Sequence, residues 1–458
     1  MDDSIGVYIH IPFCKSKCYY CDFNSYSGRE HLAGSYFSAL KDEIVSRSAA
    51  IRNRRVSSVF IGGGTPSLVD PQHIRGLLEV CSKHLDIAED AEVSMESNPG
   101  TLDYERLKLY RELGINRLSI GLQAWQDDLL KSIGRIHDRQ QFIDNLNAAV
   151  EAGFDNINVD LIFGLPGQTF DDWAETLRAV TEAGRPGGAG GSGAAATPGE
   201  TWGSNAARRH GQTDKGFLKH ISCYSLKIEE GTILGDRLDK GTLVPLDDEL
   251  DRRMYHHAVD FLAMKGYRHY EISNFACPGY ECRHNLIYWK AREYAGFGSG
   301  AHSFLNSVRF SNVSGIEQYI MAVKHRTQKA GSDGRTSLEG NWYGSVSNQS
   351  GLTEGKSGAD IGRDVQIELI EDEQRIDKIE AMAEFMILGM RLTDGVSSAE
   401  FGERFGESIE AVYGDKLDKL ISRGLVLAEI SHDRRDNVTY KLTKPGLDLA
   451  NSVFVEFI

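Results

Sequence analysis

Apolar residues occur in two patterns along the first 180 residues of the chain: short runs and longer amphipathic stretches. The short runs predict β-strands at 7–11, 58–61, 92–96, 117–120 and 157–162. The amphipathic stretches predict helices at 71–85, 102–113 and 143–152, and Gly114 and Gly153 are expected to end the last two. Strands that alternate with helices indicate βαβ units and a parallel sheet. Functional residues of such folds lie at the carboxyl ends of the strands, where polar and glycine-rich motifs of this chain fall.

Two glycine-rich stretches interrupt this pattern. Residues 184–213 contain nine glycines, and residues 328–362 contain eight. The first has almost no large aliphatic side chains and the second is also rich in serine, so both are predicted to be flexible insertions and not domains. Between them, residues 219–226 predict another strand and residues 250–265 another helix. We therefore expect one α/β domain over 1–310 and a linker over 311–374 that includes the second insertion.

The C-terminal segment, 375–458, has its own pattern of elements. Helices are predicted at 376–391, 397–405 and 409–423, a β-hairpin at 425–430 and 438–442, and a closing helix after Pro445. Three helices and a hairpin predict a helical, winged-helix-like domain. Residues 377–458 contain 10 Lys and Arg against 15 Asp and Glu, a balance that disfavours DNA binding. A covering or docking role is the better expectation.

Composition narrows the class of protein further. The chain has 458 residues and a formal net charge of −15, which argues against broad binding to nucleic acid. It has no apolar stretch of the roughly 18–20 residues that span a membrane. The N-terminus is acidic and lacks the apolar core of a signal peptide. We therefore expect a cytoplasmic protein. Peripheral association with a membrane is an open alternative, as is import into an organelle if this chain is a mature form.

The strongest chemical signal is the group of cysteines Cys14, Cys18 and Cys21, spaced C-x3-C-x2-C directly after the first predicted strand. Three thiolates on one loop can hold three irons of a [4Fe–4S] cluster and leave the fourth iron open to a small molecule. Zinc is the alternative metal, although a structural zinc site usually has four protein ligands.

With the motifs around it, this loop resembles the radical S-adenosylmethionine (SAM) superfamily. Within that superfamily the chain resembles the oxygen-independent coproporphyrinogen III oxidases. The motifs are YIHIPFC at 8–14, GGGTP at 62–66, ESNPGT at 96–101, RLSIGLQ at 117–123 and NVDLIFGLPGQT at 158–169. The resemblance implies a partial (β/α) barrel of the radical SAM type that carries one cluster, held by the three cysteines, and SAM.

The resemblance also implies which residues contact SAM. Consecutive glycines allow a ligand close to backbone amides, so 63–65 fit the amino end of SAM. Polar side chains at three successive strand ends are expected to converge on it. The implied SAM contacts are Tyr8, Tyr20, Gly63, Gly64, Thr65, Glu96, Gln123, Arg135 and Asp160.

A second motif, HNLIYW at 284–289, resembles the heme-binding motif of the HemW-type heme chaperones within this family. It implies heme contacts at His284, Asn285, Tyr288 and Trp289. A neutral imidazole is a suitable axial ligand for heme iron, and aromatic rings can stack on a porphyrin. The neighbouring Cys282 is a competing ligand, and His302 is a candidate pocket residue.

Two departures separate the chain from the oxidases that it resembles. The oxidases have a further cysteine two residues after the third cluster ligand, where this chain has Phe23, and a longer segment before the cluster loop. Both departures favour a heme chaperone that passes heme to acceptor hemoproteins. The resemblance implies membrane respiratory enzymes as acceptors and a homodimer as a possible assembly. The alternative function is an oxygen-independent coproporphyrinogen III oxidase that uses SAM radical chemistry, so whether the chain is an enzyme stays undecided.

Overall fold

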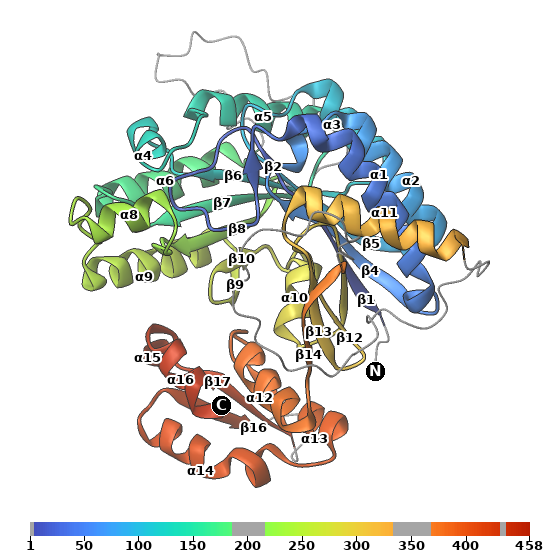
Figure 1. Cartoon of the computed structure of the whole chain (residues 1–458). Helices are drawn as coiled ribbons and strands as arrows, with labels where there is room; N and C mark the ends of the chain where they lie inside the picture. Colours follow the sequence, from blue (N-terminus) through green and yellow to red (C-terminus); the bar gives the residue numbers. More distant parts are fainter. Residues whose placement is uncertain (1–3, 186–215, 333–367, 431–436) are drawn as a thin grey trace.

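The computed structural model of the chain describes residues 4–185, 216–332, 368–430 and 437–458. Most of the two glycine-rich stretches, 184–213 and 328–362, lies outside these residues. The described chain forms a large α/β domain and a smaller C-terminal domain, which lies below it in Figure 1.

A twelve-stranded sheet forms the centre of the larger domain, in the order β14-β13-β12-β11-β1-β4-β5-β6-β7-β8-β10-β9. Its seven central strands, from β11 to β8, are parallel. They are β11 (Tyr294–Phe297), β1 (Ile5–Ile11), β4 (Arg55–Gly63), β5 (Asp86–Ser97), β6 (Arg117–Gln123), β7 (Ile157–Phe163) and β8 (Leu218–Ser225). The order has two free ends, so the sheet is the open, partial barrel that the resemblance implies.

Antiparallel strands extend this sheet at both ends. They are β10 (Asn274–Ala276) and β9 (Arg268–Glu271) on one side, and β12 (His302–Leu305), β13 (Val308–Asn312) and β14 (Ile370–Arg375) on the other. A separate pair, β2 (Phe13–Cys14) and β3 (Tyr26–Ser27), follows β1.

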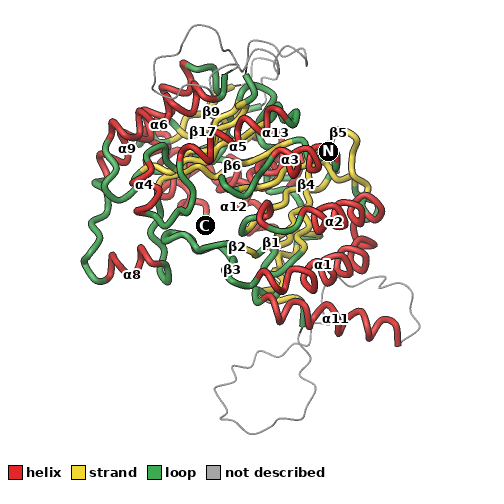
Figure 2. The backbone as a smooth tube through the Cα atoms, turned by 90° about the horizontal axis from the view of Figure 1, so that it is seen from above, coloured by secondary structure: helices red, strands yellow, loops and turns green. Residues whose placement is uncertain are grey.

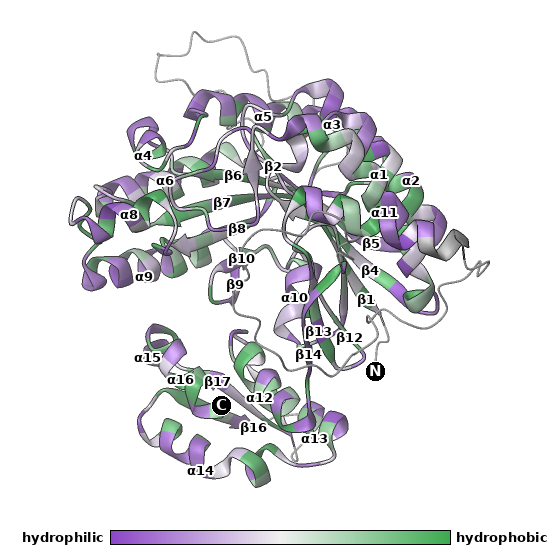
Figure 3. Ribbon diagram, in the orientation of Figure 1, coloured by the Kyte–Doolittle hydropathy of each residue, from purple (hydrophilic) through white to green (hydrophobic). Residues whose placement is uncertain are grey.

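Helices surround the curved sheet (Figure 2). They are α1 (Ala33–Arg47), α2 (Pro71–His84), α3 (Tyr104–Glu112), α4 (Asp127–Ser132), α5 (Arg139–Glu151), α6 (Phe170–Ala183), α8 (Ile233–Asp239), α9 (Asp248–Met264), α10 (Arg283–Trp289) and α11 (Ile316–Ser332). The sheet is more hydrophobic than the outer faces of these helices (Figure 3), and every residue of β6 is buried. This pattern places the main core between sheet and helices.

Local signals define several helix ends as the sequence predicts. Gly114 and Gly153 follow α3 and α5 with φ of 92° and 91°, a conformation that stops a helix and favours glycine. At its other end, α5 begins at a capping box formed by Asp138 and Gln141.

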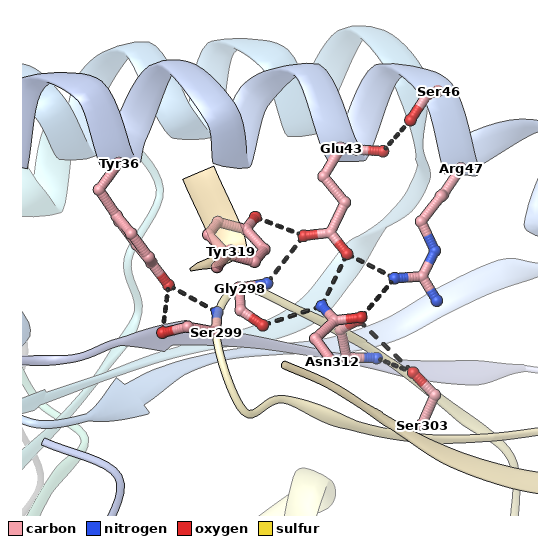
Figure 4. Close-up of polar contacts among 10 residues, drawn as sticks. Tyr36, Glu43, Ser46, Arg47, Gly298, Ser299, Ser303, Asn312 and Tyr319 are labelled. Carbon is pink, nitrogen blue, oxygen red and sulfur yellow. Dashed lines mark hydrogen bonds and ion pairs between the residues drawn. The ribbon is translucent and has the colours of Figure 1, made fainter. Parts of the chain in front are cut away.

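Helix α1 and strand β11 were not predicted. The inner face of α1 carries Glu43 and Arg47, both buried, so charged residues interrupt its apolar period. Glu43 accepts hydrogen bonds from the Gly298 amide (2.9 Å) and the Tyr319 hydroxyl (2.6 Å), and it forms an ion pair with Arg47 (Figure 4). Asn312 donates to Glu43 (2.8 Å) and accepts from Arg47 (2.9 Å). This buried network joins α1 to α11, β13 and the loop after β11.

Residues 311–374, which we expected to be a linker, differ from that expectation. They include α11, which packs on α1, and most of β14, which pairs with β13. The larger domain therefore continues beyond residue 310. Both elements lie next to the glycine-rich stretch 328–362, and each has too short a periodic pattern to be recognised in the sequence.

The C-terminal domain contains the predicted helices and hairpin. Its helices are α12 (Lys378–Gly389), α13 (Ser398–Phe405), α14 (Ile409–Ser422), α15 (Lys444–Asp448) and α16 (Ala450–Phe454). Strands β16 (Val426–Ile430) and β17 (Val438–Leu442) form the hairpin, and the two-residue β15 (Val396–Ser397) adds a third strand. Met386, Phe401 and Leu420 lie in its separate core.

Arginines join the two domains close to α10. The Arg404 guanidinium donates to the carbonyls of Lys290 (3.2 Å) and Ala291 (2.6 Å), just after the end of α10. Arg391 lies over the Trp289 ring, with its Cζ 4.3 Å from the ring centroid. The C-terminal domain therefore covers the end of the helix that carries the predicted heme motif.

Candidate functional site

The three cysteines lie on one loop that starts at β2. All three thiols are free; Cys14 is buried, and Cys18 and Cys21 are half-buried. Two groups outside the loop reach it: the Thr65 hydroxyl lies 3.6 Å from the Cys14 Sγ, and Arg135 donates to the Cys18 Sγ (3.5 Å). The loop is thereby held against the end of β4 and the segment after α4.

The donor set of this loop fits an iron–sulfur cluster. Burial raises the pKa of the Cys14 and Cys21 thiols, and the positive charge of Arg135 partly opposes this rise at Cys14. A bound metal would favour the thiolates. Among the described residues, no three His, Cys, Asp or Glu side chains converge on a single ion. A cluster does not require that convergence, because each of its irons takes its own thiolate.

The glycines at the end of β4 form a narrow backbone cradle. The Gly63 amide donates to Glu96 Oε2 (2.9 Å), and Gly63 has a φ of 113°, which favours glycine. A Cβ on Gly63 would collide with the His10 ring, and one on Gly64 would lie 2.7 Å from the Phe13 carbonyl oxygen. Larger residues at these two positions would therefore disturb the start of the cluster loop.

Three polar residues follow one another across neighbouring strands β5, β6 and β7. Burial raises the pKa of Glu96 to about 7, because the carboxylate loses its hydration. Gln123 has a φ of 74°, and its Oε1 is buried without a hydrogen-bond partner among the described residues. Asp160 accepts from the Ser119 hydroxyl (2.9 Å) and the Asn158 amide (2.8 Å). A hydrogen-bond donor on a bound ligand would satisfy the unpaired Gln123 Oε1.

Asn98 connects these parts, although sequence analysis did not select it as a site residue. Its amide donates to the Thr65 hydroxyl (2.8 Å), and its Oδ1 accepts from Arg135 Nη2 (2.6 Å). Arg135 also donates to the Gly121 carbonyl (2.5 Å). The available signal was its position two residues after Glu96, inside the ESNPGT motif.

Tyr8 and Tyr20 have different neighbours. Tyr8 shares a hydrogen bond with His10 Nδ1 (3.0 Å) and lines a cavity of about 420 Å³, together with Gly63, Glu96 and His302. Tyr20 instead packs against a small apolar cluster that includes Leu130. Phe23, which takes the place of the oxidases' additional cysteine, is exposed and lines the same cavity as Tyr8.

His284 lies on the inner face of α10 and is 1% exposed. Its Nδ1 pairs with the Ser58 hydroxyl and its Nε2 with the Tyr288 hydroxyl, each at 2.9 Å. The ring also stacks on Phe60, with centroids 5.3 Å apart. Burial lowers the pKa of His284 to about 3, so the imidazole is neutral at pH 7, but both nitrogens are engaged in this conformation.

The other three residues of the motif are less buried than His284, and Tyr288, one turn further along α10, also lines the cavity that contains Tyr8. Tyr288 and Trp289 are half-buried and line a second cavity, of about 350 Å³, at the contact with α12. Asn285 is half-buried. The competing ligand Cys282 is buried and donates to Glu92 (3.4 Å), and burial raises its thiol pKa to about 12, which disfavours the thiolate.

Comparison with known proteins identifies the family. The chain is 30% identical to the Bacillus subtilis heme chaperone HemW over 454 residues, which cover 99% of each chain. The chain belongs to the HemW family. It is also 33% identical to the Synechocystis HemW, covering 86% of this chain and 80% of that one, and 35% identical to the Escherichia coli HemW, covering 65% and 69%.

Two domain families match parts of this chain. Residues 8–180 match the radical SAM superfamily, and residues 376–432 match the HemN C-terminal domain. These matches confirm the predicted radical SAM family, whose members use a [4Fe–4S] cluster and SAM.

A solved structure confirms the fold. The chain superposes on the Escherichia coli coproporphyrinogen III oxidase HemN with a TM-score of 0.72 at 20% sequence identity. The match covers 100% of this chain and 90% of the HemN chain. No helix among the described residues of this HemW-family chain is long and apolar enough to cross a membrane.

Proposed function

We propose that this chain is a heme chaperone, which binds heme and transfers it to acceptor hemoproteins. The observation that carries the proposal is its similarity to HemW heme chaperones, which extends over 99% of the chain in the Bacillus subtilis relative. The family resemblance implies acceptors among membrane respiratory enzymes and permits a homodimer.

Cys14, Cys18 and Cys21 are the residues that would hold the cluster. Such a cluster, when bound, supplies electrons and one iron without a protein ligand, to which the amino and carboxylate groups of SAM can bind. Arg135 supports this assignment because it donates to Cys18 and its positive charge also acts on Cys14.

SAM would lie beside this loop, against Gly63, Gly64, Thr65, Glu96 and Gln123, with Tyr8, Tyr20, Arg135 and Asp160 completing the proposed site. The unpaired Gln123 Oε1 and the Glu96 carboxyl are acceptors suited to the ammonium and hydroxyl groups of SAM. Asn98 holds Arg135 and Thr65 in place beside these glycines.

Heme would bind at α10, with His284 as the axial ligand and Asn285, Tyr288 and Trp289 as its surroundings. Ligation through Nε2 requires the Tyr288 hydroxyl to leave that nitrogen, because the two atoms are 2.9 Å apart. The neutral state of the His284 ring supports the assignment, since a protonated imidazole cannot bind iron.

The test is an anaerobic heme titration of the cluster-reconstituted protein, followed by Soret absorption. We expect saturable binding of one heme per chain, and weaker binding with an altered spectrum in His284→Ala. His31→Ala is the matched control, since His31 is exposed and lines neither cavity. Weak binding that does not saturate in the wild type would refute the chaperone function.

A coproporphyrinogen III oxidase is the second candidate. The cavity of about 420 Å³ that contains Tyr8, Gly63 and Glu96 favours it, because a second ligand could lie there beside SAM. Protoporphyrinogen IX formed from coproporphyrinogen III under strict anaerobiosis, at a rate that Cys14→Ser abolishes, would establish this activity and exclude a pure chaperone.

A further inference from the structure

The cavity of about 350 Å³ between the two domains has walls from both. Trp289 and Tyr288 come from α10, Phe304 and Arg309 from the antiparallel strands β12 and β13, and Glu384 and Ile387 from α12 of the C-terminal domain. Its volume lies within the roughly 300–1,000 Å³ typical of small-molecule and cofactor sites.

Its walls suit a flat aromatic ligand. Rings line one side, and the aliphatic side chain of Ile387 lies on the facing helix. The Trp289 Nε1 is buried and has no hydrogen-bond partner among the described residues. Arg391 lies over the Trp289 ring, at 4.3 Å, and so restrains its orientation.

One ion pair in this cavity has the geometry of a carboxylate site. Arg309 Nη1 donates to Glu384 Oε1 (2.6 Å) and Arg309 Nη2 to Glu384 Oε2 (3.0 Å). This fork is the arrangement with which arginine binds any carboxylate, including one on a ligand. The two side chains are 32% and 22% exposed, so a ligand can reach them. The guanidinium also lies over the Phe304 ring at 5.3 Å, which fixes its plane.

We propose that the porphyrin of the heme cargo lies in this interdomain cavity, and that one of its propionates replaces Glu384 at Arg309. This inference rests on the proposed chaperone function and adds a specific site to it. Glu384 then acts as an internal competitor for Arg309, and heme binding breaks an ion pair that joins the two domains. Tyr288 lines the same cavity and caps His284 Nε2, so displacing Tyr288 would uncover the proposed axial ligand from this side.

The experiment titrates the full chain anaerobically with heme and, separately, with heme dimethyl ester, which lacks the free carboxylates. We expect Glu384→Gln to bind heme about tenfold more tightly and Arg309→Met to bind it about tenfold more weakly, the change expected from one charge-assisted hydrogen bond. Neither substitution should change affinity for the ester. Asp394→Asn is the matched control, because it breaks the exposed interdomain pair with Arg268, which is not part of this cavity.

Ile387→Glu provides a second variant in case Arg309→Met does not fold, which melting and circular dichroism would show. It puts a charge on the apolar wall and should weaken both heme and the ester. If the wild type binds one heme and none of the cavity variants changes its affinity, the porphyrin lies elsewhere and this inference is wrong, while the chaperone function stands. A wild type that binds no heme refutes both.

Discussion

Replacing Tyr288 with Phe tests whether the Tyr288 hydroxyl competes with heme iron for the His284 ring. The hydroxyl of Tyr288 is hydrogen-bonded to His284 Nε2 at 2.9 Å, the nitrogen that we expect to bind iron. Heme binding must break this bond, so the bond lowers the observed affinity. Phe keeps the ring, which packs edge-on against Tyr294 with centroids 4.6 Å apart.

A hydrogen bond of this kind contributes roughly 0.5–1.5 kcal/mol net. Since about 1.4 kcal/mol corresponds to a factor of ten in affinity, Tyr288→Phe should bind heme roughly two- to tenfold more tightly. The measurement is the anaerobic Soret titration, with melting temperatures recorded for each variant. The axial-ligand spectrum should stay that of the wild type.

Ser58→Ala is the matched control, because it removes the other hydrogen bond of the same ring, at Nδ1. That bond orients the imidazole and does not cover Nε2, so its loss should weaken heme binding or leave it unchanged. Weaker binding by Tyr288→Phe would refute the reasoning, since the hydroxyl would then contact heme and not compete with it.

Three further predictions concern the buried charges and the cluster loop. Glu43→Gln removes the buried negative charge that neutralises Arg47, which should cost about 3–5 kcal/mol and lower the melting temperature by several degrees. An unchanged melting temperature would contradict the importance of this network. The carboxyl of Glu96, whose pKa burial raises to about 7, favours the folded state when protonated, so the wild type should lose about 2–3 kcal/mol between pH 5 and 8 in ligand-free unfolding, and Glu96→Gln should lack that loss. Parallel pH curves for the two proteins would show that Glu96 is not the group responsible. Cys18→Ser should lose the cluster's visible absorption after reconstitution, whereas Cys81→Ser, which alters a buried thiol of α2, should retain it.

Much of the fold could be predicted from the sequence because its signals are local. Six of the seven parallel strands were placed from apolar runs, and glycines such as Gly114 marked helix ends through their own backbone preference. Helix α1 was missed because its inner face buries Glu43 and Arg47, whose other partners, Gly298 and Asn312, lie more than 250 residues away. Their burial depends on those distant partners, which no local pattern reveals.

The candidate site divides in the same way. The spacing of Cys14, Cys18 and Cys21, and the motif at 284–289, could be recognised from neighbouring residues alone. The role of Asn98 could not be recognised in this way, because Asn98 contacts Thr65 and Arg135, and the three residues lie on separate loops that only the fold brings together.

The sequence by itself determined the alternation of strands and helices and the spacing of the three cysteines, since periodicity, spacing and caps act within a few residues. The residues that we propose around SAM and heme came from the resemblance of their motifs. The tertiary structure alone decided that His284 is buried with both nitrogens engaged and that Arg309 meets Glu384 across two domains. These facts depend on contacts between positions 226 and 75 residues apart, which exist only once the sheet has formed and the C-terminal domain has packed on α10.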